Sequence, residues 1–132
     1  MNAGQCLCGA VRFEARAALT SVTYCHCSRC RRWHGHVGAF CAVDRDALVI
    51  VDDAALRWFS DTPGVRRGFC SVCGSSLFFD EAADQKIGIC AGSLNAPTTT
   101  REKAHIYVAS KGDYYQVPTD GLLRFDTFPG KP

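Results

Sequence analysis

Cysteines are the residues of this sequence whose number and spacing could carry chemistry. The 132 residues include nine of them, an odd number that a framework of paired disulfides alone would not produce. Seven fall into three short clusters, and such tight spacing in a reducing compartment favours metal or redox chemistry. The nine positions are Cys6, Cys8, Cys25, Cys27, Cys30, Cys41, Cys70, Cys73 and Cys90.

The first and third clusters together predict one closed zinc site. Cys6-Leu7-Cys8-Gly9 and Cys70-Ser71-Val72-Cys73-Gly74 each offer two thiolates from a tight turn. Structural zinc takes four ligands in a tetrahedron, at about 2.3 Å for sulfur, so two such pairs complete the site. Glycine after the second cysteine suits the turn because it tolerates positive φ. The alternative is a thioredoxin-like redox pair at Cys70 and Cys73, although no βαβ pattern surrounds that pair.

The second cluster predicts a zinc site with an open position. Cys25-His26-Cys27-Ser28-Arg29-Cys30 places three cysteines within six residues. Three protein ligands leave a fourth position for water or substrate, which is typical of catalytic zinc. A substrate thiol in that position would be held as a thiolate, because zinc lowers the pKa of a bound thiol. Arg29, Arg31 and Arg32 would help to offset the negative charge that results.

Alternatives for the second cluster remain open at this point. A fourth side chain could close the site, and the three arginines could be ordinary solvated charges. The middle side chain of a Cys-x-Cys run tends to point away from the metal, which makes His26 the weakest fourth ligand. Cys41 and Cys90 lie in apolar runs and are interpreted as core thiols, and His105 as a structural histidine. The possible fourth ligands are His26, His34, His36 and Cys41.

Hydrophobic patterning predicts a mainly β fold with little helix. Short apolar or alternating runs are separated by Gly, Asp and Pro, and no long window repeats every 3.6 residues. One helical turn is predicted over Ser28 to His34, and an irregular tail over Pro118 to Pro132. The predicted strands are Ala10 to Ala15, Val37 to Val43, Leu48 to Val51, Leu56 to Phe59, Leu77 to Phe79, Ile87 to Ala91 and His105 to Val108.

Length and composition predict a single globular domain over residues 1–132. The formal charge is +2, which seven thiolates and two Zn²⁺ ions would bring to about −1, so no nucleic-acid partner is expected. The first residues lack the features of a signal peptide, and no run approaches the roughly 18 apolar residues of a membrane span. We therefore expect a cytoplasmic protein without a membrane partner, and the sequence does not indicate its oligomeric state.

The three clusters, in this order, resemble those of the glutathione-dependent formaldehyde-activating enzyme family, which includes centromere protein V. The resemblance extends over roughly Gly4 to Pro129, with weaker echoes at Gly92-Ser93-Leu94 and His105-Ile106. The stretches that carry it are Cys6-Leu7-Cys8-Gly9-Ala10-Val11, Cys25-His26-Cys27-Ser28-Arg29-Cys30-Arg31 and Phe69-Cys70-Ser71-Val72-Cys73-Gly74-Ser75.

This resemblance implies a fold of small zinc-stapled β-sheets, often called a β-tent. It implies a carbon–sulfur lyase type of activity on a small thiol adduct, with formaldehyde adding to the thiol of glutathione to give S-hydroxymethylglutathione. It also implies two zinc ions, one structural and one catalytic. The implied ligands are Cys6, Cys8, Cys70 and Cys73 for the structural ion and Cys25, Cys27 and Cys30 for the catalytic ion.

Two other functions stay open on the sequence alone. In one, both zinc ions are structural and the chain is a non-catalytic binding module for a protein or chromatin partner, as the centromere relative suggests. In the other, the three-cysteine loop stores metal or senses oxidants, because accessible thiolates of low pKa oxidise readily.

Overall fold

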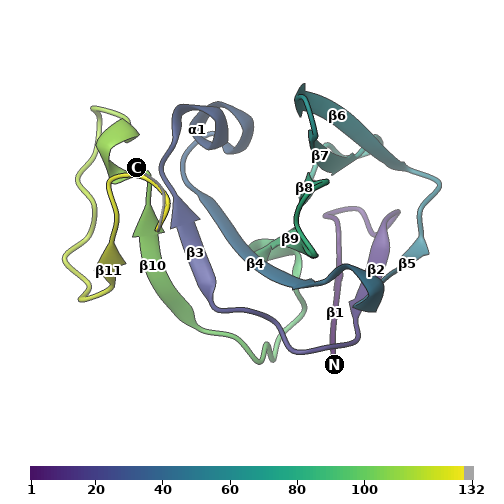
Figure 1. Ribbon diagram of the computed structural model, residues 1–132. Coiled ribbons are helices and arrows are strands. Elements are labelled where there is room, and N and C mark those ends of the chain that lie inside the picture. Colours follow the sequence, from purple (N-terminus) through teal and green to yellow (C-terminus); the bar gives the residue numbers. More distant parts are fainter. Residues whose placement is uncertain (130–132) are drawn as a thin grey trace. The chain divides into compact units, whose positions relative to one another are not determined.

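The computed structural model describes residues 1–129, and this part of the chain divides into two compact units (Figure 1). Unit 1 contains Met1–Thr20 and Cys41–Thr100, and unit 2 contains Ser21–Phe40 and the described residues from Arg101 onward. Short strands are the predominant regular structure of both units, which confirms the predicted mainly β class. The expectation of one domain stays a prediction. Across residues 1–129, no helix has the length and apolar character needed to span a membrane.

Unit 1 contains two sets of antiparallel strands. Three strands pair in the order β1-β2-β5, and β9, β8, β7 and β6 follow one another beside the second half of β4 (Gly38–Asp44). Short 3₁₀ turns at Arg45–Ala47 and Ala91–Ser93 follow β4 and β9. The strands are β1 (Asn2–Gln5), β2 (Arg12–Ala15), β5 (Leu48–Asp52), β6 (Leu56–Thr62), β7 (Val65–Cys70), β8 (Ser76–Glu81) and β9 (Lys86–Cys90).

The core of unit 1 joins these two sets of strands. Phe13 of β2 meets Phe78 of β8 edge to face, with ring centroids 5.1 Å apart, and both side chains are fully buried. Val11, Leu77 and Ile89 are buried in the same unit. Burial of each such side chain contributes roughly 1.5–3 kcal/mol. The turns that carry the first and third cysteine clusters therefore extend from packed strands.

Unit 2 consists of three short strands, the first half of a fourth, and one helix. β3 (Val22–Cys25) lies between β10 (Glu102–Ile106), which runs parallel to it, and the first half of β4 (Gly38–Asp44), which runs antiparallel. β11 (Leu123–Arg124) adds to the far side of β10 in parallel (Figure 1). Helix α1 (Ser28–His34) leaves the end of β3 almost at once.

Helix α1 coincides with the predicted helical turn. It begins after Cys27, whose sulfur accepts a hydrogen bond from the Cys30 N–H, and it ends at Gly35, whose φ of 81° is left-handed. Arg31, Arg32 and His34 lie in its last turn, where cations favour the negative end of the helix dipole. Both ends are therefore encoded within nine residues.

Four strands were absent from the sequence prediction, and several predicted boundaries differ from the observed ones by two or three residues. β7 was missed because Arg66 and Arg67 interrupt its apolar pattern. The buried Arg67 side chain is neutralised by Asp61 at 2.8 Å. β10 ends at Ile106 instead of Val108, because Tyr107 adopts a left-handed φ of 56° before a 3₁₀ turn. β11 lies within the tail predicted as irregular, whose last three residues fall outside the described part. The missed strands are β1, β3, β7 and β11.

A buried carboxylate stabilises the β7–β8 region of unit 1. Arg45 and Arg66 bind separate oxygens of Asp80, at 2.7 and 2.8 Å, and the Asp80 side chain is only 6% exposed. Burial raises the pKa of Asp80, but the hydrogen bonds from Arg66 and Arg45 outweigh it and hold the pKa below its usual value. Asp80 therefore stabilises the fold in its ionised form.

Replacing Asp80 with asparagine is expected to lower the free energy of unfolding by on the order of 2 kcal/mol at pH 7, because two charge-assisted contacts to a buried carboxylate are lost. A carboxylate with a depressed folded pKa stabilises above its unfolded pKa, and the effect disappears as pH falls through the folded value. The difference from wild type should therefore shrink below about pH 4. Denaturant unfolding of wild type and variant, from pH 7 to below about pH 4, measures this difference in the free energy of unfolding.

Asp44→Asn is the matched control, since Asp44 pairs with Lys86 at 2.7 Å but both side chains are largely exposed. Its effect should stay below about 0.5 kcal/mol at every pH. Equal effects of the two substitutions would contradict the role assigned to Asp80.

Candidate metal centres

Four cysteines of unit 1 converge on one point. The sulfur atoms of Cys6, Cys8, Cys70 and Cys73 all lie within 4.8 Å of one another. The Cys6–Cys8 and Cys8–Cys70 sulfur distances are 3.7 and 3.8 Å. A tetrahedron with zinc–sulfur bonds of about 2.3 Å has edges of about 3.8 Å. The donor set and its spacing therefore fit a four-coordinate zinc ion.

The two turns that supply these sulfurs share one backbone design. The Gly9 N–H donates to the Cys6 carbonyl at 3.3 Å, and the Gly74 N–H donates to the Cys70 carbonyl at 2.8 Å. Both glycines have φ near 80°, a conformation that side chains with a Cβ rarely adopt. The glycines predicted from the sequence are thus the residues that close both turns.

Ser75 joins the two turns to each other. Its hydroxyl accepts a hydrogen bond from the Leu7 N–H at 2.9 Å and lies 3.1 Å from the Cys73 sulfur. The hydrogen bond from Ser75, followed by backbone N–H groups, lowers the pKa of Cys73 to about 5. Cys73 is thus prepared as the thiolate that zinc requires.

The three cysteines of the second cluster also converge, in unit 2. Cys25 ends β3, Cys27 caps α1, and Cys30 lies in the first turn of that helix. Their sulfur atoms lie within 4.8 Å of one another. Cys25 and Cys30 are buried with Ile106, and Phe40 and Phe125 pack against this group. The β3–α1 junction therefore places three sulfur donors in apolar surroundings.

Cys27 is the thiol of this cluster that ionises most readily. Hydrogen bonds from the Cys25 and Cys30 thiols, and then from the backbone of Cys30 and Arg29, lower the pKa of Cys27 to about 2. Its sulfur therefore has two roles. It accepts the hydrogen bond from the Cys30 N–H at the start of α1, and it offers a negatively charged ligand atom for a metal ion.

Within residues 1–129, no further histidine, cysteine or carboxylate joins the three sulfurs. Cys41 is buried, and its thiol faces the Ile89 carbonyl at 3.9 Å, as a core thiol would. Cys90 is buried as predicted. His34 packs its ring edge against Phe40, and His36 bonds the Tyr114 hydroxyl at 2.6 Å. None of the four possible fourth ligands belongs to the group.

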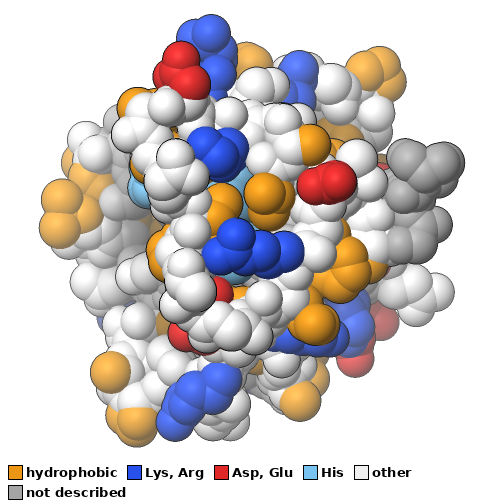
Figure 2. Space-filling model, turned by 90° about the vertical axis from the view of Figure 1, so that its left-hand side faces the viewer, with side chains coloured by type: hydrophobic (Ala, Val, Ile, Leu, Met, Phe, Trp, Pro, Cys, Tyr) orange, Lys and Arg blue, Asp and Glu red, His pale blue; other side chains and the backbone are white. Residues whose placement is uncertain are grey.

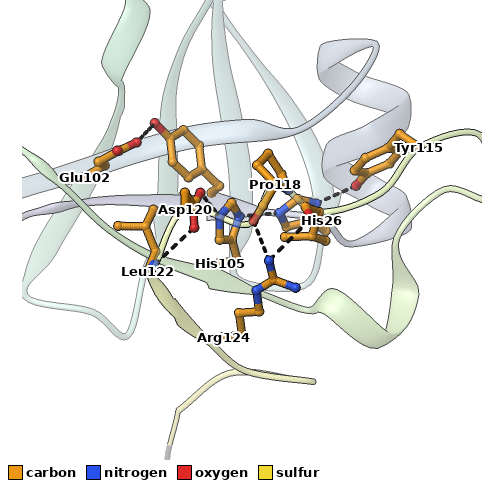
Figure 3. Close-up of polar contacts among 10 residues, drawn as sticks. His26, Glu102, His105, Tyr115, Pro118, Asp120, Leu122 and Arg124 are labelled. Carbon is orange, nitrogen blue, oxygen red and sulfur yellow. Dashed lines mark hydrogen bonds and ion pairs between the residues drawn. The ribbon is translucent and has the colours of Figure 1, made fainter.

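His26 does not belong to the group of three sulfurs, and it takes part in a chain of hydrogen bonds (Figure 3). Its Nδ1 bonds the Tyr115 hydroxyl, and its Nε2 lies 2.8 Å from Nδ1 of His105. His105 Nε2 lies 2.8 Å from Oδ2 of Asp120. Burial, followed by the charge of His105, lowers the pKa of His26 to about 4, so its ring is neutral at pH 7. His105 is thus buried and bonded, as a structural histidine would be.

The loop that carries Tyr115 and Asp120 is held by several further bonds. Lys111 donates to the Tyr115 carbonyl at 2.7 Å, and Arg124 of β11 donates to the Val117 and Pro118 carbonyls (Figure 3). Oδ1 of Asp120 accepts from the Leu122 N–H at 3.1 Å, which orients the carboxylate. Sequence reasoning missed this network, because Tyr115 and Asp120 lie in segments without a strand or helix signal.

Tyr115 lies within electrostatic range of the three-cysteine group. Burial raises the pKa of Tyr115, as do Tyr114 and Cys25, whereas Arg31 lowers it. Its ring stacks on His26 at 5.7 Å and meets His36 edge to face at 4.6 Å. The Tyr115 hydroxyl is thus bonded to His26, which lies between Cys25 and Cys27 in the sequence.

Arg31 is an arginine of the cluster whose charge acts on Tyr115, where it lowers the pKa. Its Cδ approaches the position that a Cβ on Gly112 would occupy, at 3.2 Å. Its Nε is buried and makes no hydrogen bond to any residue of the described part. Arg29 and Arg32 are exposed on the same helix. Arg31 therefore offers positive charge beside Tyr115.

Comparisons with known proteins identify a family, a curated relative and a similar solved structure. The profile of the family described as glutathione-dependent formaldehyde-activating enzyme matches residues 1–110. A curated protein of Schizosaccharomyces pombe named as an uncharacterized lyase is 27% identical over 77 residues, 58% of this chain. The matched region spans only 55% of that relative. A crystal structure of a Rhodobacter sphaeroides protein superposes with a TM-score of 0.60 at 25% identity, covering 74% of this chain and 91% of that one.

Proposed function

Because the chain belongs to the glutathione-dependent formaldehyde-activating enzyme family, we propose that it is a zinc-dependent carbon–sulfur lyase acting on the formaldehyde adduct of a small thiol. The observation that carries the proposal is the group of three sulfurs at Cys25, Cys27 and Cys30, which no fourth protein donor completes among the described residues. A site with three protein ligands keeps a position for substrate, whereas a structural site is closed by four.

The chain's own residues prepare this site for a thiol. The β3–α1 junction fixes the three sulfurs, and the apolar surroundings of Cys25 and Cys30 exclude water on one side. Zinc held there would supply a Lewis acid that lowers the pKa of a substrate thiol and orients its sulfur. The four-cysteine group of unit 1 would hold a second, structural zinc, because its ligand set is complete.

Positive charge in the last turn of α1, the helix that carries Cys30, favours an anionic thiol. Three thiolates and one Zn²⁺ carry about −1, and a bound thiolate makes about −2, which a nearby cation helps to offset. Arg31 has a buried Nε without a hydrogen-bond partner in residues 1–129 and could bind a substrate carboxylate. Figure 2 shows Lys and Arg at several separate places on one face, not as one continuous stripe. Glutathione, a thiol with carboxylates, fits these properties.

Exchange NMR on a mixture of glutathione and formaldehyde tests the proposal. The zinc-loaded protein is expected to accelerate exchange between free glutathione and S-hydroxymethylglutathione above the uncatalysed baseline. The same protein treated with a chelator and returned to the same buffer should lose the acceleration.

An absence of acceleration by the zinc-loaded protein would overturn the assignment of glutathione and formaldehyde as substrates. Cysteine, cysteamine and coenzyme A, tested with formaldehyde in the same way, would then show whether another thiol is used. Failure with all of them would favour the non-catalytic binding module.

A further inference from the structure

Solvent exposure separates one member of the four-cysteine group from every other cysteine. Of the nine cysteines, all of which lie within residues 1–129, only Cys8 is exposed. Its neighbour Leu7 is 85% exposed, so the turn after β1 places this part of the group at the surface of unit 1. In the three-cysteine group of unit 2, by contrast, Cys25 and Cys30 are buried and Cys27 is half-buried. A reagent dissolved in the solvent therefore meets Cys8 first.

The Cys8 sulfur has two further sulfurs close to it. The Cys6 sulfur lies 3.7 Å away in the same turn, and the sulfur of Cys70, the last residue of β7, lies 3.8 Å away. Both of these neighbours are buried, so solvent reaches them less easily than it reaches Cys8. An exposed thiolate beside a second cysteine is the arrangement that oxidant-sensitive sites use, because the second sulfur traps the oxidised first one as a disulfide.

Cys70 is the better placed of the two neighbours to form that disulfide. Cys6 and Cys8 are only two residues apart, and a bridge between them would close a small ring that departs from relaxed disulfide geometry. The Cys6 sulfur also accepts a hydrogen bond from the Val11 N–H at 3.3 Å, which holds it in place. Cys70 is 62 residues from Cys8 in the sequence and approaches from the other turn, so a bridge to it closes no small ring.

We propose that Cys8 is an oxidant-sensitive site, at which hydrogen peroxide replaces the zinc site of unit 1 by a disulfide between Cys8 and Cys70. Zinc takes cysteine as thiolate, so the loaded group presents Cys8 to solvent as a nucleophile. The sequence alone left oxidant sensing open at the three-cysteine loop, whereas the observed burial points to the other group. The inference goes beyond the proposed lyase function and does not depend on it, because that function belongs to unit 2.

The proposed oxidation uses one molecule of hydrogen peroxide for each disulfide. The Cys8 thiolate attacks one peroxide oxygen, the O–O bond breaks, and Cys8 becomes a sulfenic acid as hydroxide leaves. The Cys70 thiolate then attacks the Cys8 sulfur, so that the S–S bond forms, the S–O bond breaks and a second hydroxide leaves. The two sulfurs together lose two electrons, which reduce the peroxide. Two protons from solvent convert both hydroxides into water.

This disulfide would change what holds the two turns of unit 1 together. Cys6 and Cys73 remain as the only thiolates of the group, and two sulfurs are too few for a structural zinc site, so the ion is released. The new bond still joins the turn after β1 to the turn after β7. A thiol reductant reopens it by exchange, and added zinc then restores the four-sulfur site.

Zinc release from the zinc-loaded protein under hydrogen peroxide tests the proposal without any measurement of activity. A colorimetric chelator should report one zinc per chain released at least about ten times faster than the other. Cys27→Ser, which removes a sulfur donor of unit 2, should retain the fast release and lack the slow one. Mass spectrometry of alkylated peptides should find the Cys8–Cys70 disulfide during the fast release, while the buried thiols of Cys41 and Cys90 are still reduced.

Two histidine substitutions form a matched pair, because structural zinc also accepts three cysteines and one histidine. Cys8→His removes the exposed sulfur and keeps a fourth ligand, so release of zinc from unit 1 by peroxide should slow by at least about tenfold. Cys73→His changes the ligand set in the same way but leaves Cys8 in place, and its release should stay within about threefold of wild type. Zinc content per chain before oxidation shows whether each variant is loaded.

The peptide map of wild type decides the proposal by itself if either histidine variant does not load zinc. A first disulfide other than Cys8–Cys70, or a reduced Cys8 after unit 1 has released its zinc, would overturn the proposal. Equal release from loaded Cys8→His and wild type would also overturn it, as would faster release from unit 2 than from unit 1. Thiol–formaldehyde exchange is measured separately, so a failure of the proposed function and a failure of this inference are distinguishable.

Discussion

Replacing Cys8 with serine is expected to lower the melting temperature by more than about 10 °C, through a loss of more than about 4 kcal/mol in the free energy of unfolding. Cys8 is exposed, so the substitution removes almost no core packing. What it removes is one of four sulfur donors that hold the turn after β1 to the turn after β7. Zinc binding to such a site is coupled to folding, and a weakened site releases that stabilisation.

Circular dichroism on heating measures the melting temperature, and mass spectrometry measures the zinc content per chain. Leu7→Ser is the matched control, because Leu7 is 85% exposed in the same turn and supplies no ligand. It should change the melting temperature by less than about 2 °C. Wild-type stability and zinc content in Cys8→Ser would show that the four-cysteine group is not a structural zinc site.

Replacing Cys27 with serine is expected to bring the exchange of glutathione and formaldehyde down to the uncatalysed rate while the fold survives. Serine is a preferred residue at the start of a helix, so its hydroxyl can still accept the Cys30 N–H and cap α1. A neutral hydroxyl is a poor zinc ligand, and the site is left with two sulfurs, at Cys25 and Cys30. Activity and zinc in unit 2 should be lost together.

Cys90→Ser is the control for this substitution. Cys90 is a buried thiol outside both clusters, and its sulfur lies 3.4 Å from the Ser76 hydroxyl, where a serine can also bond. Exchange NMR on both variants, with zinc content per chain, separates loss of a ligand from loss of a thiol. Full activity in Cys27→Ser would remove the three-cysteine group from the proposed mechanism.

The two ligand substitutions also separate the roles of the two clusters. Cys8→Ser should destabilise unit 1, whereas Cys27→Ser should stop catalysis with little change in melting temperature. Loss of stability in both would support two structural zinc ions and hence the binding module. We expect the two variants to differ because the unit 1 group has four sulfur ligands and the unit 2 group has three.

Both cysteine groups could be predicted before the structure, because each set of donors belongs to short local motifs. Two pairs with a following glycine indicate a closed site, and three cysteines within six residues indicate an open one. Helix α1 was predicted with its observed bounds for the same reason, since its cap at Cys27 and its end at Gly35 are local. Strands with an uninterrupted apolar run, such as β5 and β8, were also found, within one or two residues.

Features that depend on distant partners could not be predicted. β7 contains Arg66 and Arg67, which look like a surface pattern until Asp80 and Asp61 are seen to neutralise them. The chain from Tyr115 to Asp120 depends on β3 lying parallel to β10, a pairing that joins residues some 80 positions apart. A metal motif is encoded by spacing along the chain, whereas a hydrogen bond between remote side chains exists only once packing has brought them within 3 Å, and no periodicity in the sequence records that distance.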